Sequence, residues 1–302
     1  MRFDFDEDQQ AIRNDARRFL TERCAMDSVR DYLQGDQAEV SPLWHEMSEL
    51  GWQGVAIPEA FGGLGMGYLE LCVLAEELGR VAAPVPFASS IYLAAEAILR
   101  FGSKAQKDKY LPGLASGQLI GTVAWAETQR VAGDSETIER VQIRDGYLNG
   151  AMWPVPFGAL ADIAVLGIRN AQAELELMIA ELNPSSGESR ATITHLPLNS
   201  VDPSQANVRL NFYRHPAESL GDAAHGGGAL EDLLNSCRND GLRASGRGRP
   251  MPRNGDRACA PAFHFWQNRW FLSGGQAQAR NDVRPQRIGK VKRLLRSLGA
   301  VC

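Results

Sequence analysis

The sequence predicts an α+β protein, in which an all-α amino-terminal domain is followed by a small β-barrel domain. Apolar residues recur at helical spacing up to about residue 118, whereas short alternating runs separated by turn residues begin near Ile120. These two periods are typical of amphipathic helices and of half-buried strands. The composition then changes towards basic residues. We therefore divide the 302 residues into a helical domain (1–118), a β domain (119–222) and a degenerate basic tail (223–302).

The helical domain is predicted as a series of amphipathic helices. The segment 68–80 carries four apolar residues on one helical face: Leu71, Leu74, Ala75 and Leu78. The segment 88–102 predicts one long helix that ends at Gly102. Ser103 followed by Gln106 predicts a capping box, in which each residue hydrogen-bonds the other's backbone N–H at the start of the next helix.

The β domain is predicted from short runs rich in β-branched and aromatic residues, such as 120–126 and 208–213. The dipeptide Asp145-Gly146 lies between two such runs and predicts a tight hairpin turn. Strands this short, at close spacing, are typical of a small barrel or sandwich.

The composition is typical of a water-soluble globular protein, with 44% hydrophobic and 23% charged residues. No apolar run approaches the roughly 20 residues that span a bilayer, and the acidic start lacks the basic and apolar regions of a signal peptide. The five cysteines have no C-x-x-C spacing and the five histidines no ligand spacing, so we expect neither a metal site nor a disulfide framework. These features predict a cytoplasmic protein that does not bind membranes.

The charge is distributed unevenly along the chain. Residues 236–302 hold 14 of the 32 Lys and Arg residues but 3 of the 36 Asp and Glu residues, which gives this tail a net charge of +11 against −15 for the rest. A basic tail of this kind is one signature of nucleic-acid binding, although charge alone binds phosphate without sequence specificity.

Two blocks resemble the acyl-CoA dehydrogenase family of flavoproteins. They are LWHEMSELGWQGVAIPEAFGGLGMGYLELCVLAEELGR at 43–80 and GSKAQKDKYLPGLASGQLIGTVAWAE at 102–127, and the resemblance extends from residue 1 to about 235. It implies FAD bound between the β domain and a carboxy-terminal four-helix bundle. It further implies an acyl-CoA thioester as substrate, an electron-transfer flavoprotein as electron acceptor, and a homo- or hetero-oligomer. In the family, a Glu of the bundle removes the α-proton and the β-hydrogen leaves as hydride to the flavin.

The resemblance places five residues of the β domain at the flavin: Trp125, Ala126, Glu127, Trp153 and Val155. Ala126 lacks the hydroxyl of the family's Thr, and Val155 cannot donate the hydrogen bond that a family Thr gives to the flavin. Pro154 removes a backbone donor next to it. Without the resemblance, the two tryptophans would be interpreted as ordinary core aromatics.

The tail predicts an out-of-frame carboxy terminus. When codons with chosen third bases are written for FWQNRWFLSGGQAQAR (265–280) and read from the second base, they encode FGRTGGSFQAVKHKL, which resembles the family's bundle. The same shift gives amino-acid sequences that resemble the family's bundle from Ser236 onward and over 289–300. We therefore predict a frameshift near Asn235 and an absent or disordered bundle, so we assign no catalytic residue in this chain. The shift also explains the excess of arginine, so we do not expect nucleic acid as a partner.

The predicted function is FAD-dependent α,β-dehydrogenation of an acyl-CoA thioester, in fatty acid or steroid side-chain oxidation, by a truncated and impaired chain. The alternative is an FAD-lacking partner subunit of a heteromeric acyl-CoA dehydrogenase, without catalysis of its own. The residues at 126, 154 and 155 favour this alternative.

Overall fold

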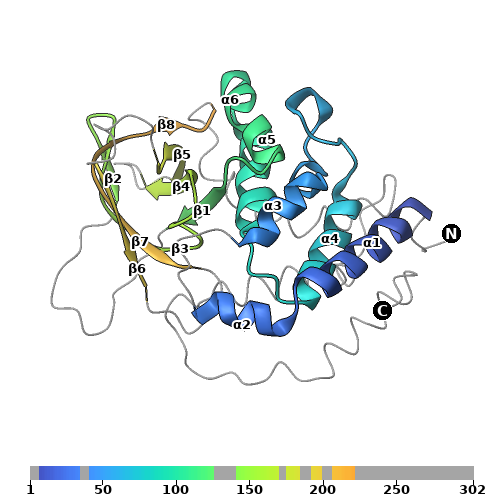
Figure 1. The fold of residues 1–302 in the computed structure, drawn as a ribbon. Coiled ribbons are helices and arrows are strands. Elements are labelled where there is room, and N and C mark those ends of the chain that lie inside the picture. Colours follow the sequence, from blue (N-terminus) through green and yellow to red (C-terminus); the bar gives the residue numbers. More distant parts are fainter. Residues whose placement is uncertain are drawn as a thin grey trace, which may run out of the picture.

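The computed structural model describes residues 7–34, 41–125, 141–169, 175–183, 192–198 and 206–221. In this part of the chain the helices lie together on one side and the strands on the other (Figure 1), which confirms the α+β fold class. Ala126, Glu127 and the predicted basic tail from residue 223 lie outside the described residues.

The helical region begins with four α-helices and two short 3₁₀ turns. Their bounds are α1 (Glu7–Arg23), α2 (Met26–Gln34), α3 (Pro42–Glu49), η1 (Trp52–Gly54), η2 (Glu59–Phe61) and α4 (Tyr68–Arg80). Helix α4 covers the predicted segment 68–80, and its four predicted inward residues are all buried. The apolar spacing therefore identified both the helix and its buried face.

The second half of the helical region contains η3 (Ala88–Ala95), α5 (Glu96–Phe101) and α6 (Lys104–Ala115). The helix predicted over 88–102 is confirmed as one continuous helical stretch that ends before Gly102, although its first eight residues have the wider winding of a π-helix. Serine side chains in this turn bond to groups outside the helix: Ser89 Oγ donates to the Pro86 carbonyl (3.1 Å), and Ser90 Oγ accepts from Gly121 N (3.0 Å). Such bonds compete with the regular helical ladder. The predicted capping box at the start of α6 is confirmed.

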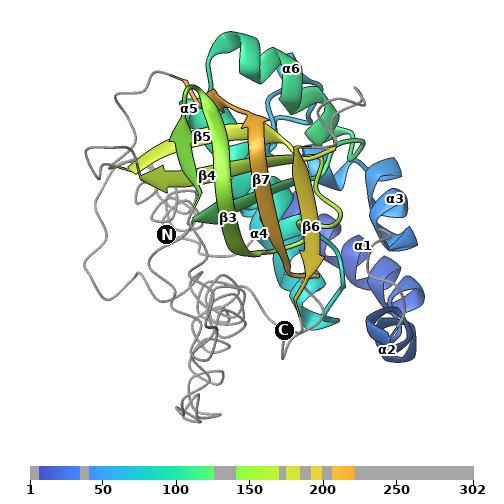
Figure 2. The same ribbon diagram turned by 90° about the vertical axis from the view of Figure 1, so that its left-hand side faces the viewer.

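The strands of the β region form two four-stranded sheets, which Figure 2 shows from their side of the molecule. The first has the order β1 (Gly121–Trp125), β4 (Ile163–Arg169), β5 (Leu175–Glu181), β8 (Glu218–Ser219). The second has the order β2 (Gln142–Arg144), β3 (Tyr147–Val155), β7 (Val208–Pro216), β6 (Ile193–Pro197). Strands β1 and β4 are parallel, and the other neighbouring pairs are antiparallel.

The predicted hairpin turn is confirmed between β2 and β3. Arg144 pairs directly with Tyr147, and the two residues between them have φ angles of 52° at Asp145 and 77° at Gly146. Positive φ at both central positions is the geometry of a type I′ turn, which Asp-Gly adopts readily.

The helical and β regions share their hydrophobic cores. One cluster joins Leu20, Met47 and Leu74 of the helices to Met152 and Leu210 of the second sheet. The other cluster packs η3, α5 and α6 against the first sheet. Burial across both junctions means that the helices support the two sheets directly.

Helix α6 also binds the end of the described β region through polar contacts. Gln106 Nε2 donates to the Ser219 carbonyl (2.8 Å), and Gln106 Oε1 accepts from Gly221 N (3.0 Å). Tyr110 Oη donates to a carboxylate oxygen of Glu218 (3.1 Å), and burial is the main cause that raises the pKa of Tyr110 to about 12. Residue 221 is thereby held against the helical region.

Candidate functional site

Trp125 is the last residue of β1. The four residues before it are buried, whereas Trp125 is half-buried and packs against the cluster of α5, α6 and the first sheet. The side chain therefore remains partly accessible where β1 ends. The next two predicted site residues, Ala126 and Glu127, lie outside the described part of the chain.

Trp153 lies near the end of β3 and is also half-buried. The guanidinium carbon of Arg209, on the neighbouring strand β7, lies 5.4 Å from the centroid of its indole ring. Arg209 Nε donates to Asn211 Oδ1 (2.8 Å), and Asn211 Nδ2 donates to Thr194 Oγ1 (3.1 Å). This chain of bonds holds the arginine over the indole, which is the geometry of a cation–π contact.

Val155 lies two residues further along β3, and its side chain is completely buried opposite Val208. The valine side chain has no hydrogen-bond donor or acceptor, so any hydrogen bond to a cofactor at this position would use backbone atoms. The predicted contact at Val155 stays a prediction under that restriction.

Strands β1 and β3 come from different sheets, but a hydrogen bond joins the start of β1 to the residue that follows β3. Thr122 Oγ1 of β1 donates to the Pro156 carbonyl, directly after β3, at 2.7 Å. The structure thus brings the strands that carry Trp125 and Trp153 against each other. The hydroxyl of Thr122 is occupied by this bond.

FAD is the cofactor that the resemblance implies, and the described residues fit one part of it. Half-buried indole surface at Trp125 and Trp153 suits a planar ring system, and the Arg209 guanidinium suits an anionic or carbonyl-bearing edge. The end of β3 supplies few donors, since Pro154 and Pro156 have no N–H. The fit is therefore good for stacking, and the hydrogen bonds must come from other residues.

Two histidines of the second sheet bind the end of β5. The ring nitrogen Nε2 of His215 lies 2.9 Å from the Glu181 carbonyl and must donate, because a carbonyl only accepts. Its Nδ1 is then the acceptor for Thr192 Oγ1 (2.7 Å). Burial lowers the pKa of His215 and of its neighbour His195. These neutral histidines tie the sheets together, and no group of three metal-ligating side chains occurs in the described ranges.

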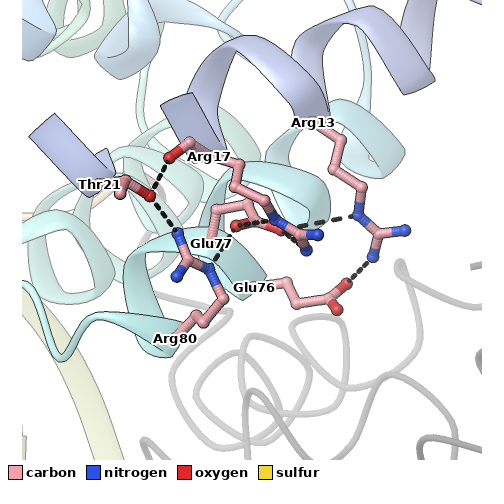
Figure 3. Close-up of polar contacts among 6 residues, drawn as sticks. All are labelled: Arg13, Arg17, Thr21, Glu76, Glu77 and Arg80. Carbon is pink, nitrogen blue, oxygen red and sulfur yellow. Dashed lines mark hydrogen bonds and ion pairs between the residues drawn. The ribbon is translucent and has the colours of Figure 1, made fainter. Parts of the chain in front are cut away.

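A charged cluster joins α1 to α4 (Figure 3). Glu77 is fully buried and accepts hydrogen bonds from Arg17 (2.6 and 3.1 Å) and from Arg80 (2.7 Å). Arg13 is 2% exposed, lies 3.7 Å from Glu77, and pairs with Glu76 at 2.6 Å. The sequence analysis did not predict this charged cluster. Arg13 and Arg17 are four residues apart, as are Glu76 and Arg80, and that helical spacing was the available signal.

Comparison with known proteins identifies the helical region. Residues 6–118 match the family model of the acyl-CoA dehydrogenase N-terminal domain, which covers the chain up to the first strand. The chain contains an acyl-CoA dehydrogenase N-terminal domain. This acyl-CoA dehydrogenase domain packs on the sheets that carry Trp125 and Trp153.

One curated relative is the mitochondrial isovaleryl-CoA dehydrogenase of Bos taurus, which is 31% identical over 166 residues, or 53% of this chain and 38% of the bovine protein. The chain therefore spans about two fifths of that relative. An acyl-CoA dehydrogenase of Geobacillus kaustophilus has a similar structure, with a TM-score of 0.65, 20% identity, and coverage of 97% of this chain and 75% of that one. The ChsE4–ChsE5 complex of Mycobacterium tuberculosis aligns with a TM-score of 0.64, 21% identity, and coverage of 99% and 74%. At these identities the two structures show the fold.

No helix of the described segments is long and apolar enough to cross a membrane. The predicted cytoplasmic location stays a prediction.

Proposed function

We propose that this protein is an acyl-CoA dehydrogenase-type oxidoreductase that binds FAD along the ends of β1 and β3. The observation that carries the proposal is the family domain at 6–118, followed directly by sheets that present Trp125 and Trp153 half-buried on adjoining strands. Fold similarity alone would not support a function. Here the aromatic positions that the family resemblance selects also lie on strands that contact each other.

The residues of this chain have separate tasks in such a site. Trp125 and Trp153 provide apolar surface that orients a planar cofactor and excludes water, and Arg209 places a positive charge beside it. FAD, when bound, supplies the acceptor for the hydride that leaves the β-carbon of the acyl-CoA. We assign the proton-abstracting base to no described residue. The substrate class is an acyl-CoA thioester, without a preference for fatty or steroid acyl groups.

Partners follow from the same proposal. An electron-transfer flavoprotein is the expected electron acceptor, and a homo- or hetero-oligomer is the expected assembly. The similarity to the ChsE4–ChsE5 complex supports an assembly of different subunits as one form that this fold adopts.

The second candidate is an FAD-lacking partner subunit, which needs the fold but not the cofactor. Complete burial of the Val155 side chain, in a segment bounded by two prolines without N–H groups, favours it. Under this proposal the described sheets would serve assembly, and the flavin would be bound by the other subunit.

Flavin binding separates the two candidates. The full chain would be purified, its visible absorbance recorded, and FAD titrated into the apoprotein while flavin fluorescence is followed. Saturable binding supports the first candidate, and reduction of the bound flavin by an acyl-CoA would establish the activity. If no flavin binds under any condition, the first candidate is wrong. Restored activity on co-expression with a flavin-bearing dehydrogenase subunit would then establish the second.

The proposed truncation and impairment need a different experiment. Sequencing of the DNA around codon 235 would show whether a single-base shift opens a frame that encodes the bundle. A DNA sequence without such a frame would contradict the proposed frameshift and leave residues 236–302 as a genuine part of the protein.

A further inference from the structure

Two polar residues of the β7 region belong to no predicted site: Arg209, which lies over Trp153, and Asn207, two positions before it. Asn207 directly precedes β7, and its carbonyl accepts from Leu198 N (2.9 Å), which continues the ladder between β6 and β7 by one more residue. Residues two apart on a strand face the same side of the sheet. Asn207 therefore shares a sheet face with Arg209, which lies over Trp153.

The amide of Asn207 is buried without any hydrogen bond. Its residue is 4% exposed, yet neither Nδ2 nor Oδ1 has a partner. Asn211, four residues further along the same face, is 9% exposed and uses both amide atoms, one with Arg209 and one with Thr194. Buried amides are nearly always satisfied, because their bonds to water are otherwise lost without replacement. A ligand that both accepts and donates would satisfy Asn207.

Arg209 also has unused hydrogen-bonding capacity. Its Nε is bound to Asn211, which fixes the guanidinium over the indole of Trp153. No atom of the described residues accepts a hydrogen bond from its two terminal nitrogens. A guanidinium that is held in place and still has free donors is suited to oxygen acceptors and to negative charge.

We propose that Asn207 and Arg209 bind the polar edge of the flavin ring that Trp153 accommodates, and so supply the hydrogen bonds that the end of β3 lacks. The pyrimidine edge of a flavin carries carbonyl oxygens, acceptor nitrogens and one N–H, which matches an amide that both donates and accepts. Reduced flavin is anionic at neutral pH, so the positive charge of Arg209 would stabilise the reduced form more than the oxidised form. This inference rests on the proposed flavin binding.

The test uses the full chain, with riboflavin and FAD as separate ligands. Riboflavin lacks phosphate, so its affinity reports contacts with the ring and its ribityl chain alone. Arg209→Gln and Asn207→Leu are each expected to weaken binding of both ligands by on the order of tenfold, because each removes hydrogen bonds to the ring. Arg209→Gln should also lower the reduction potential of bound FAD. A variant that weakens FAD but not riboflavin would overturn the ring assignment in favour of a phosphate contact.

Arg214→Gln is the matched control. Arg214 lies on the same strand, with its guanidinium carbon 4.8 Å from the Tyr147 ring, but at the opposite end of β7 from Arg209. Its substitution should leave both affinities unchanged. Equal loss in this control would show that any cation–π arginine of β7 supports the sheet, which contradicts a binding role for Arg209.

The unliganded protein provides a readout that separates binding from structure. If Asn207 serves a ligand, Asn207→Leu should leave the thermal midpoint of the apoprotein unchanged or raise it, because an unsatisfied amide is replaced by an apolar group. A lower midpoint would assign Asn207 a structural role and overturn the inference. Wild-type protein that binds neither flavin would refute the proposed function itself, whereas wild-type binding with unaffected variants would refute only the roles of Asn207 and Arg209.

Discussion

The buried charge of Glu77 offers the clearest test of how the helical region is held together. Its carboxylate has no exposed surface and is surrounded by Arg13, Arg17 and Arg80 (Figure 3). Burial raises the pKa of Glu77, but hydrogen bonds from Arg17 and Arg80 and their charges outweigh it, and the pKa lies below its usual value. We therefore expect Glu77→Gln, which keeps the shape and removes the charge, to destabilise the protein.

The size of the effect follows from the exposure of the three arginines. Removing one partner of a buried ion pair costs about 3–5 kcal/mol, since the other charge is left buried. Arg17 and Arg80 are 38% and 40% exposed, so water can compensate for part of their loss. Arg13, at 2% exposure, cannot reach water but keeps Glu76 at 2.6 Å. We expect a loss at the lower end of the range, about 3 kcal/mol.

Urea unfolding would measure this loss, and a surface pair provides the control. Asp15 and Arg18 are 3.0 Å apart with side chains 69% and 72% exposed, so Asp15→Asn should cost less than about 1 kcal/mol. The two variants should differ in midpoint but not in the slope of the transition. If Glu77→Gln costs no more than Asp15→Asn, the cluster does not hold α1 against α4.

Acid provides an independent check on the same residue. Because the folded pKa of Glu77 lies below the ordinary value of 4.5, its stabilising contribution is present above that value and is lost as the pH falls through the folded pKa. The wild type and Glu77→Gln should therefore converge in stability in acid. A constant difference at every pH would contradict an origin in the charge.

Three further substitutions test other contacts. Since burial holds the pKa of His215 below 6.5, stability should fall as the pH drops below about 6.5, and His215→Gln should reduce that slope in thermal unfolding curves. Gly221→Ala should lower the thermal midpoint far more than Gly146→Ala: both glycines have positive φ, but the new Cβ at 221 would lie 1.9 Å from the Phe101 carbonyl oxygen, whereas the one at 146 meets nothing within 4 Å. Trp44→Phe removes a buried hydrogen bond of 3.0 Å to a backbone carbonyl and should cost about 1–3 kcal/mol in urea unfolding. The three expectations would be contradicted, respectively, by an unchanged pH slope in His215→Gln, by equal thermal midpoints for the two glycine variants, and by equal urea midpoints for wild type and Trp44→Phe.

Helices, caps and turns that depend on a few neighbouring residues were predictable from the sequence. The apolar spacing of 68–80 determines both the existence of α4 and its buried face, because a helix repeats every 3.6 residues. The capping box at Ser103 and the hairpin at Asp145 depend on residues no more than three apart. Local chemistry decides these features without help from the rest of the chain.

Features that depend on distant pairing were not predictable in the same way. Whether Val155 faces a cofactor or the core depends on its partner Val208, 53 positions away, and on a bulge in β3 between Met152 and Val155. A shift of one residue on a strand exchanges its two faces. The resemblance selected Val155 by its place in a motif, and the register placed its side chain in the core. The contact of Arg209 with Trp153 also crosses two strands and has no local signature.

Flavin affinity and catalysis should be separable in this protein, and that separation distinguishes the proposals better than activity alone. The indole surfaces, Asn207 and Arg209 belong to sheets whose cores are packed against the helical region. The proposed base is assigned to no described residue. A chain that binds riboflavin through Asn207 and Arg209 but does not oxidise acyl-CoA would show that these residues bind flavin without the base. Loss of riboflavin binding in Arg209→Gln would then identify these residues as the source of flavin affinity, whichever residue acts as the base.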